Sequence, residues 1–283
     1  MKTIKLLILS LILSLTSVVY GQLFQQRDAS FDLTGALGVA SYYGDLVDKS
    51  PVFRQPSFCG SVGVAYNYNP HLSVRGDFSY MQIQGSDSKN SRAALKARNL
   101  SFKSNLWDLN ASIEYNAIDI TGEHKFTPYA FIGIGLCHFN PYTTDRNGKK
   151  VYLQPMGTEG QGLSAYPDRT PYSTTILQIP FGAGLKYVLS DKLILGFEFK
   201  YRYVDTDYLD DVSNSSYPDK AVLSAKNPSL PQLTYRGDEL PGGAPYPAPS
   251  LNRGNPNNRD AYYSVQFKII YRIKHYEHVD VNY

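Results

Sequence analysis

The strongest constraint in this sequence is a strict alternation of apolar and polar side chains in segment 192–204. One side of the segment is entirely apolar or aromatic: Leu193, Leu195, Phe197, Phe199, Tyr201 and Tyr203. The opposite side carries Glu198, Lys200 and Arg202 in a row. Because successive side chains of a strand point to opposite faces, this period predicts a β-strand with an apolar face and a charged face. The apolar face would meet either a soluble core or membrane lipid, and the charged face either water or the lumen of a barrel.

The same period recurs along the chain and predicts eight strands in all. They are expected at 32–43, 58–68, 72–80, 106–116, 129–139, 176–188, 192–204 and 261–273. Most have 11 residues or more, which is enough to cross a bilayer when a strand is tilted. Segment 129–139 is apolar on both faces, so its pattern leaves the direction of its side chains open.

The connections between these segments alternate in length. Long loops are expected at about 44–56, 84–100, 140–175 and 205–259, and the connections between them are short or moderate. Outer-membrane barrels have short periplasmic turns and long outer loops, whereas a soluble sandwich has no reason to alternate in this way. We therefore predict an all-β fold, an eight-stranded antiparallel transmembrane up-and-down β-barrel. The even number of strands would leave both termini of the chain in the periplasm.

The first 21 residues have the pattern of a signal peptide. Lys2 and Lys5 precede the apolar run 6–19, and Val19 and Gly21 are small enough for a cleavage site. Cleavage after Gly21 would leave a barrel domain at 22–283 in the outer membrane; the alternative is an uncleaved anchor. Cleavage also removes Lys2 and Lys5, so the formal net charge falls from +3 by two. The mature chain would be nearly neutral, and its charge gives no argument for a nucleic-acid partner. The 24 tyrosines suit aromatic girdles at a membrane interface, with outer-membrane lipid as the surrounding partner.

Charged residues on the polar faces are expected to fill the barrel. An eight-stranded barrel is only wide enough for side chains, so pairing of opposite charges would give a plugged interior and no pore. The predicted lumen residues are Asp32, Arg75, Asp77, Asp108, Glu114, Lys186, Glu198, Lys200, Arg202, Lys268 and Arg272.

An acidic loop follows the seventh strand, with Asp205, Asp207, Asp210 and Asp211 close together. Carboxylates at this density could bind Ca²⁺, but the spacing is not that of an EF-hand, and a solvated acidic loop is the simpler interpretation. His138 could act as a general base in a barrel enzyme, yet no nucleophile motif accompanies it. We predict neither a catalytic residue nor a cofactor.

The two cysteines, Cys59 and Cys137, fall in the second and fifth predicted strands. Those strands are not neighbours, and a disulfide requires Cα atoms within about 7 Å. Two free thiols are therefore expected.

Several motifs occur in a characteristic order at the ends of the predicted strands. They are YYGDL at 42–46, FNP at 139–141, YLQP at 152–155, GTEGQG at 157–162, IPFGAG at 179–184 and TDYLDDVS at 206–213. Together they resemble a family of outer-membrane barrels from the Bacteroidota that includes PorG of the type IX secretion system. The residues that carry this signature are Tyr43, Gly44, Asp45, Gly157, Glu159, Gly160, Tyr208, Leu209, Asp210 and Asp211.

The resemblance implies a non-enzymatic part of the type IX protein secretion machinery that contacts a periplasmic ring of PorK-like and PorN-like proteins. Segments 22–30, 117–127 and 275–283 would then carry the contacts, because they lie on the periplasmic side. Two other functions stay open: a surface barrel that binds a ligand, with Ca²⁺ at Asp205–Asp211, and an enzyme acting at the outer rim.

Overall fold

A computed structural model describes residues 30–47, 55–120, 123–213, 216–254 and 259–275. The predicted signal peptide lies outside these residues, as do most of segments 22–30 and 275–283. No helix in the described part of the chain is both long enough and apolar enough to cross a membrane.

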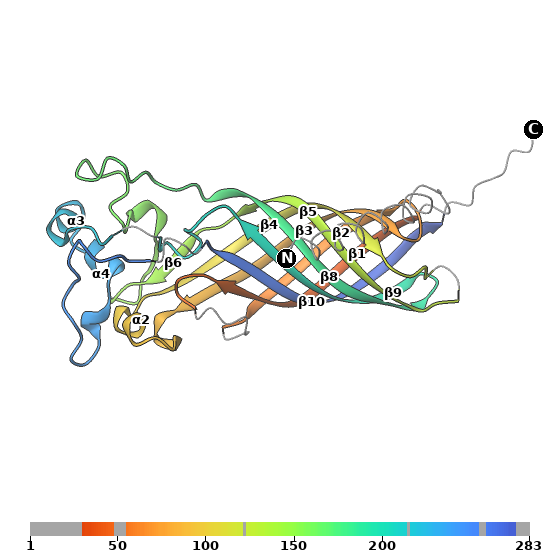
Figure 1. The fold of residues 1–283 in the computed structure, drawn as a ribbon, viewed down its shortest axis with the longest axis horizontal. Coiled ribbons are helices and arrows are strands. Elements are labelled where there is room, and N and C mark those ends of the chain that lie inside the picture. Colours follow the sequence, from red (N-terminus) through yellow and green to blue (C-terminus); the bar gives the residue numbers. More distant parts are fainter. Residues whose placement is uncertain (1–29, 48–54, 121–122, 214–215, 255–258, 276–283) are drawn as a thin grey trace, which may run out of the picture.

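Eight long strands form a closed antiparallel barrel (Figure 1), which confirms the predicted fold class. They are β1 (Ser30–Tyr43), β2 (Ser57–Asn67), β3 (Leu72–Ser86), β4 (Ser101–Asn116), β5 (Phe126–His138), β8 (Thr175–Ser190), β9 (Leu193–Val204) and β10 (Ala261–His275). Neighbours in sequence pair with each other, β1 pairs with β10, and the β3–β4 pair belongs to the same ring. Ser30 pairs with His275, so the beginning of β1 and the end of β10 lie at the same end of the barrel.

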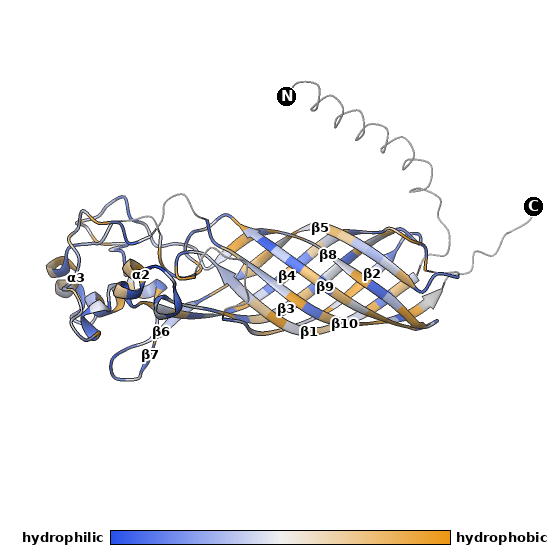
Figure 2. Cartoon of the chain, turned by 60° about the horizontal axis from the view of Figure 1, so that its bottom comes forward, coloured by the Kyte–Doolittle hydropathy of each residue, from blue (hydrophilic) through white to orange (hydrophobic). Residues whose placement is uncertain are grey.

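The alternation seen in the sequence separates the two surfaces of the barrel wall. Large apolar side chains point outward all around the barrel, as in Leu37, Val62, Ile134 and Phe267, of which Phe267 is 71% exposed. The hydropathy colours of Figure 2 alternate along the strands in the same way. The sequence did not show which face of β5 is directed outward. In the structure, Ile132 and every second residue on either side of it point outward.

Two strands are longer than their alternation predicts. β3 continues to Ser86 and β4 begins at Ser101, and the two stay paired over this extension. The outward residues there include Gln82, Gln84 and Lys103, so the apolar period ends although the strand does not. A strand that rises beyond the lipid no longer needs an apolar outer face, and therefore the sequence pattern underestimated its length.

The long loops fold over one end of the barrel, opposite the short turns (Figure 1). We call the described residues of these loops the cap: 44–47, 55–56, 87–100, 139–174, 205–213, 216–254 and 259–260. The cap contains η1 (Asp87–Lys89), α2 (Ala93–Arg98), β6 (Pro141–Thr144), β7 (Lys150–Tyr152), η2 (Gln154–Met156), α3 (Lys220–Lys226), α4 (Leu230–Thr234) and η3 (Gly237–Glu239). β6 and β7 form a hairpin that extends the sheet beside β4. Segments predicted as plain loops are thus a folded layer.

Candidate functional site

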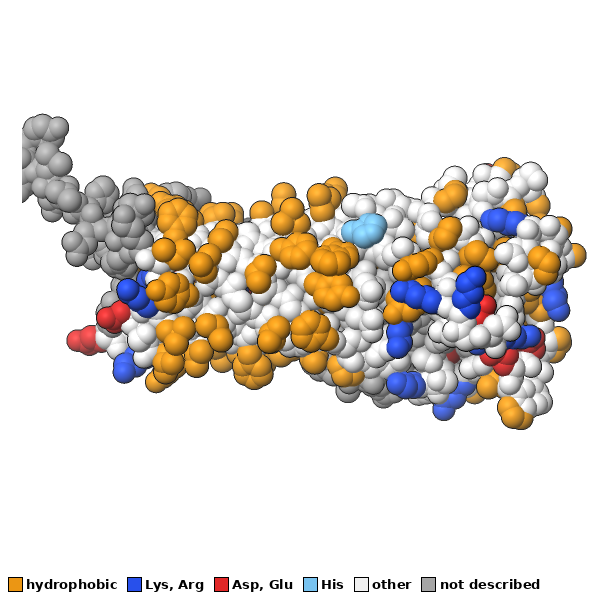
Figure 3. All heavy atoms as spheres, turned by 180° about the vertical axis from the view of Figure 1, so that it is seen from behind, with side chains coloured by type: hydrophobic (Ala, Val, Ile, Leu, Met, Phe, Trp, Pro, Cys, Tyr) orange, Lys and Arg blue, Asp and Glu red, His pale blue; other side chains and the backbone are white. Residues whose placement is uncertain are grey.

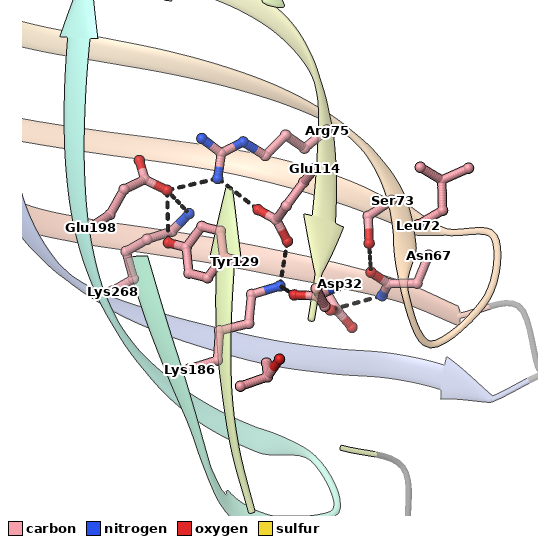
Figure 4. A network of polar contacts seen from close by, with 12 residues as sticks. Asp32, Asn67, Leu72, Ser73, Arg75, Glu114, Tyr129, Lys186, Glu198 and Lys268 are labelled. Atoms are coloured by element: carbon pink, nitrogen blue, oxygen red, sulfur yellow. Dashed lines mark hydrogen bonds and ion pairs between the residues drawn. The ribbon is translucent and has the colours of Figure 1, made fainter. Parts of the chain in front are cut away.

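The barrel interior contains a chain of ion pairs that joins opposite walls (Figure 4). Arg75 Nη1 on β3 lies 2.8 Å from Glu114 Oε2 on β4 and 2.7 Å from Glu198 Oε2 on β9. Lys186 pairs with the other oxygen of Glu114, and Lys268 Nζ lies 2.9 Å from Glu198 Oε2. These five residues are buried, so the pairs replace the hydration that each charge loses inside the barrel.

The ion pairs continue toward the cap. Lys200 pairs with Asp77, and Arg202 Nε lies 2.7 Å from Asp108 Oδ2 with both side chains fully buried. Tyr262 donates to Asp108 Oδ1 over 2.7 Å. We call the buried charges of both levels the lumen network: Arg75, Asp77, Asp108, Glu114, Lys186, Glu198, Lys200, Arg202 and Lys268. Below it, Arg272 Nε lies 3.3 Å from Asp32 Oδ1 near the short-turn end.

The part of the interior nearest the cap is apolar, which the sequence analysis did not anticipate. One buried cluster joins inward residues of the strands, such as Met81, Ile83 and Leu106, to cap residues such as Leu209 and Leu233. The prediction of an interior filled by paired charges therefore needs correction at this end. Inward positions that lie against a folded cap have apolar side chains because they form a common core with it.

A second polar cluster lies above this apolar layer, inside the cap. Tyr42 Oη is 2.6 Å from Asp210 Oδ2 and 2.8 Å from Asp260 Oδ1, and it accepts the backbone N–H of Asp45 at 2.9 Å. A phenol has one hydrogen to donate, so one of these two oxygen–oxygen contacts needs a proton from a carboxyl group. The arrangement thus holds at least one carboxyl in its protonated form.

Arg253 is the cation at the centre of this cluster. Its Nη1 lies 3.1 Å from Glu159 Oε1 and 2.5 Å from the carbonyl oxygen of Asp211, and its Nε donates to the carbonyl oxygen of Thr234 over 3.2 Å. Glu159 also accepts the backbone N–H of Ser213 at 3.0 Å and its hydroxyl at 2.5 Å. We call the following residues the cap cluster: Tyr42, Asp45, Thr158, Glu159, Asp210, Asp211, Ser213, Arg253 and Asp260.

A second buried arginine, Arg98, connects the cap cluster to the loop after β3. Its Nε and Nη2 donate to the two oxygens of Asp87 over 2.7 and 2.8 Å. The same guanidinium donates to the carbonyl oxygens of Arg253 and Asp45. A planar guanidinium with five donors suits this role, because one side chain can satisfy carbonyls from several loops.

Two signature residues have backbone reasons for their identity. A Cβ atom on Gly44 would lie 1.8 Å from Tyr42 Oη and 2.1 Å from Asp260 Oδ1, so a larger residue would break that contact. Asp211 has a φ of 65°, a left-handed conformation that costs energy in a residue other than glycine. Its side chain accepts hydrogen bonds from Thr158 and from Tyr172, the latter over 2.8 Å, and these contacts stabilise that conformation.

Burial changes the protonation of the carboxyls in the cap cluster. It raises the pKa of Asp211 to about 6, against the lowering effect of Arg253 and the Thr158 hydrogen bond. Burial and the charge of Asp45 raise the pKa of Asp210 well above its usual range, and burial with the charge of Asp210 does the same for the pKa of Asp260. The cluster therefore takes up protons more readily than ordinary carboxylates do.

The acidic loop was predicted to be solvated, and this prediction is wrong for two of its four residues. Asp210 and Asp211 are buried and bind different partners. Asp205 is exposed and pairs with Arg259. Within the described ranges, no group of three or more His, Cys, Asp or Glu side chains is arranged to hold a metal ion. Two of these carboxylates are close in sequence because both belong to the core of the cap. Their spacing along the chain did not show that their side chains point in different directions.

The structure brings together some predicted residues and not others. Asp45, Glu159, Asp210 and Asp211 meet in the cap cluster, and Leu209 packs in the apolar layer beneath it. Tyr208 lies outside the cluster and stacks on Tyr172 with ring centroids 4.5 Å apart. Gly157 and Gly160 supply left-handed turns with φ of 66° and 85°, and Tyr43 is a half-buried residue at the end of β1.

Sequence reasoning missed residues that complete the cluster. Arg98, Arg253 and Asp260 lie in segments that were predicted only as polar or Pro-rich loop. No alternation or motif marks them, since their partners are more than 50 residues away in most contacts. Cys59 and Cys137 are free and buried, as the sequence predicted for the two thiols.

A barrel with an apolar outer belt, a charged interior and loops gathered at one end is a small transmembrane β-barrel of the outer-membrane type. The family model described as "Outer membrane protein beta-barrel domain" matches residues 8–221. The chain belongs to this family, and the protein is therefore located in the outer membrane, with the cap on the outer side and the short turns in the periplasm. No curated protein matches the chain.

Solved structures similar to the chain are also outer-membrane proteins. Neisserial surface protein A is 13% identical, with a TM-score of 0.42 over 86% of this chain and 99% of its own. Ail of Yersinia pestis is 9% identical, with a TM-score of 0.40 over 88% of this chain and 100% of its own. A major outer membrane protein from Thermus thermophilus is 12% identical, with a TM-score of 0.41 over 87% of this chain and 99% of its own. At these values the assignment rests on the family model alone.

Proposed function

We propose that this protein is a non-enzymatic outer-membrane barrel that serves as an anchoring component of a type IX protein secretion machinery. In this role it is PorG-like and contacts a periplasmic ring of PorK-like and PorN-like proteins. The observation that carries the proposal is the convergence of separate signature motifs. YYGDL, GTEGQG and TDYLDDVS are far apart in sequence, and each contributes to the cap cluster.

The interior of the barrel supports an anchoring role over a conducting one. The lumen network crosses between opposite strands, and an apolar layer lies between it and the cap cluster. A secreted protein chain would have to displace both layers. An anchor needs only a stable wall in the membrane and surfaces at its two ends.

The periplasmic end offers accessible residues for a ring partner. The described part of segment 117–127 exposes Glu123, His124 and Lys125 beyond the apolar belt. At the same end, the turn between β8 and β9 exposes Asp191 and Lys192. The first turn is therefore the site to alter, and the second provides a matched control at the same depth.

The test is co-purification of the ring proteins with tagged barrel from the native membrane. In one variant, residues 123–125 become Gly-Ser-Gly and segment 276–283 is deleted; in the control, Asp191→Ser and Lys192→Ser are combined. We expect the first variant to lose the ring proteins and the control to retain them. Gel mobility with and without heating checks that each barrel is folded. Full retention by a folded first variant would contradict the proposed contact, and normal surface display of secreted proteins in a deletion strain would contradict the secretion role.

A further inference from the structure

The outward side chains of β3 and β4 change in a regular order as the strands leave the membrane. Cross-strand pairs follow one another as Phe78 with Leu109, Tyr80 with Trp107, Gln82 with Asn105, and Gln84 with Lys103. The order is apolar, aromatic, amide and then cationic. Aromatic girdles mark the edge of the hydrocarbon region, and Trp107 is 47% exposed at that level. The amides and Lys103 therefore lie just beyond the hydrocarbon.

The β6–β7 hairpin adds a second lysine, Lys150, which lies opposite Thr144 and whose ammonium group reaches the ring of Tyr142. Tyr142 on β6 lies opposite Lys103 on β4. Lys150 Nζ on β7 is 3.7 Å from the centroid of the Tyr142 ring and 4.7 Å from that of Tyr152. Both lysines are exposed, and the contacts with the rings orient Lys150 beside the wall that carries Lys103.

Hydrogen bonds between side chains of the barrel wall and of β6 hold Tyr142 in place. Gln82 Nε2 donates to Asn105 Oδ1 over 3.0 Å and lies 3.4 Å from Tyr142 Oη. Residues from β3, β4 and β6 are thus connected across the outer surface. The position of Tyr142, and through it that of Lys150, is set by the barrel wall and not by a free loop.

Among the described residues, the two lysines have no anionic partner of their own. No carboxylate among the described residues pairs with Lys103 or Lys150, whereas the exposed Arg146 pairs with Asp238 and the exposed Arg259 with Asp205. On the face seen in Figure 3, apolar side chains cover the barrel and Lys and Arg side chains gather where the barrel meets the cap.

Depth identifies the partner. Lys103 lies four residues beyond Trp107, which is about 10 Å along the membrane normal for a strand that rises about 3.3 Å per residue at a tilt of about 40°. The headgroup layer extends roughly 5–8 Å beyond the hydrocarbon on each side, and a lysine side chain can reach back toward it. We propose that Lys103 and Lys150, with the Gln82 and Asn105 amides, bind a phosphate group of a lipid in the outer leaflet. This inference does not depend on a role in secretion.

The experiment measures lipid binding to the refolded full-length barrel in non-ionic detergent by native mass spectrometry. The probe is a diphosphorylated glycolipid of the lipid A type, compared with its dephosphorylated form. The test variant combines Lys103→Gln and Lys150→Gln. A matched control combines Lys220→Gln and Lys226→Gln, which removes two exposed lysines of α3 at the far end of the cap (Figure 1). A Lys103→Arg and Lys150→Arg variant keeps both charges.

Each basic residue near a charged membrane surface contributes about fivefold in affinity, so the test variant, which lacks two, should bind the phosphorylated lipid about 25-fold more weakly. The control and the arginine variant should bind as the wild type does, and inorganic phosphate at millimolar concentration should not displace the lipid. Equal affinity of the wild type for both lipid forms would overturn the proposal. An equal loss in the α3 control would also overturn it, since diffuse attraction by the cap would then explain binding, and displacement by inorganic phosphate would exclude a lipid-specific site.

Discussion

The lumen network and the cap cluster both bury charge, with opposite balances. In the lumen network, five cations face four carboxylates: Arg75, Lys186, Lys200, Arg202 and Lys268 against Asp77, Asp108, Glu114 and Glu198. The cap cluster contains five carboxyls and one cation, Arg253, which pairs with two of them, Glu159 and Asp211; the other three are Asp45, Asp210 and Asp260. A buried arginine keeps its charge, while a buried carboxyl can become neutral by binding a proton. The lumen thus depends on fixed pairing, and the cap can adjust to a lost partner or to pH.

The largest effect should come from removing a carboxylate of the lumen network. Glu198→Gln takes away the charge that Arg75 and Lys268 share, and the Arg75 guanidinium cannot become neutral in response. Breaking a buried ion pair from one side costs about 3–5 kcal/mol, which urea unfolding in lipid vesicles would measure as a loss of unfolding free energy. Glu239→Gln removes a more exposed carboxylate that pairs with Arg146 and Arg236, and should cost less than about 1 kcal/mol. If both variants lost the same unfolding free energy, burial in the lumen would not make these ion pairs more important for stability than exposed ones.

A smaller effect is expected when the cap cluster loses its cation. In Arg253→Met, Glu159 and Asp211 stay buried without their partner, but proton uptake relieves part of the cost. We expect a loss of about 2–3 kcal/mol, confined to the cap. Hydrogen exchange read by mass spectrometry should show faster exchange in 157–163 and 209–213 and unchanged exchange in the strands. Arg146→Met is the exposed control, and spread of the loss to the strands would show that cap and barrel open together.

Acidification should stabilise the cap. The pKa of Asp211 is raised in the folded protein to about 6, so its contribution to stability is greatest below its ordinary pKa and is lost as the pH rises through 6. Between pH 8 and pH 5 the cap should gain on the order of 1–2 kcal/mol. Protease cleavage of the cap, scaled at each pH to cleavage of an unfolded peptide, should therefore slow on acidification. Asp211→Asn should flatten this dependence, and a cap that is cleaved faster at pH 5 would contradict the sign.

The smallest effect concerns the shared hydroxyl. Tyr42→Phe removes the donor between Asp210 and Asp260, whose buried carboxyls can still bind protons and so lose their repulsion. The expected loss is about 1 kcal/mol in the same protease assay. Tyr43→Phe, at the neighbouring residue on the outer side of the strand, is the control and should leave cleavage unchanged. A loss above that of Arg253→Met would mean that the hydroxyl, and not the cation, organises the cluster.

The sequence predicted the barrel well because one physical rule acts at every position of its wall. Lipid outside and a narrow polar interior impose the same alternation on segments such as 192–204. The number of strands, and which side chains face the lipid, can therefore be predicted from the local sequence. The rule fails where the surroundings change: at Gln84 and Lys103 the strand continues beyond lipid, and at Met81 the interior meets a cap. The cap cluster obeys no period. Arg253 and Asp260 acquire partners only through folding, so their roles could not be read from neighbouring residues.

The pairing of the first strand with the last has a consequence for how the molecule assembles. β1 meets β10 only when more than 200 intervening residues have been placed, and such distant closure is slow because chain entropy is lost before contacts form. Asp260 directly precedes β10 and Arg253 lies a short distance before it, so both would arrive with this strand. We therefore expect the pairing of β1 with β10 and the contacts of the cap cluster to form together, late in folding. Until then the chain exposes an open sheet edge, whose unpaired backbone groups can pair with another chain.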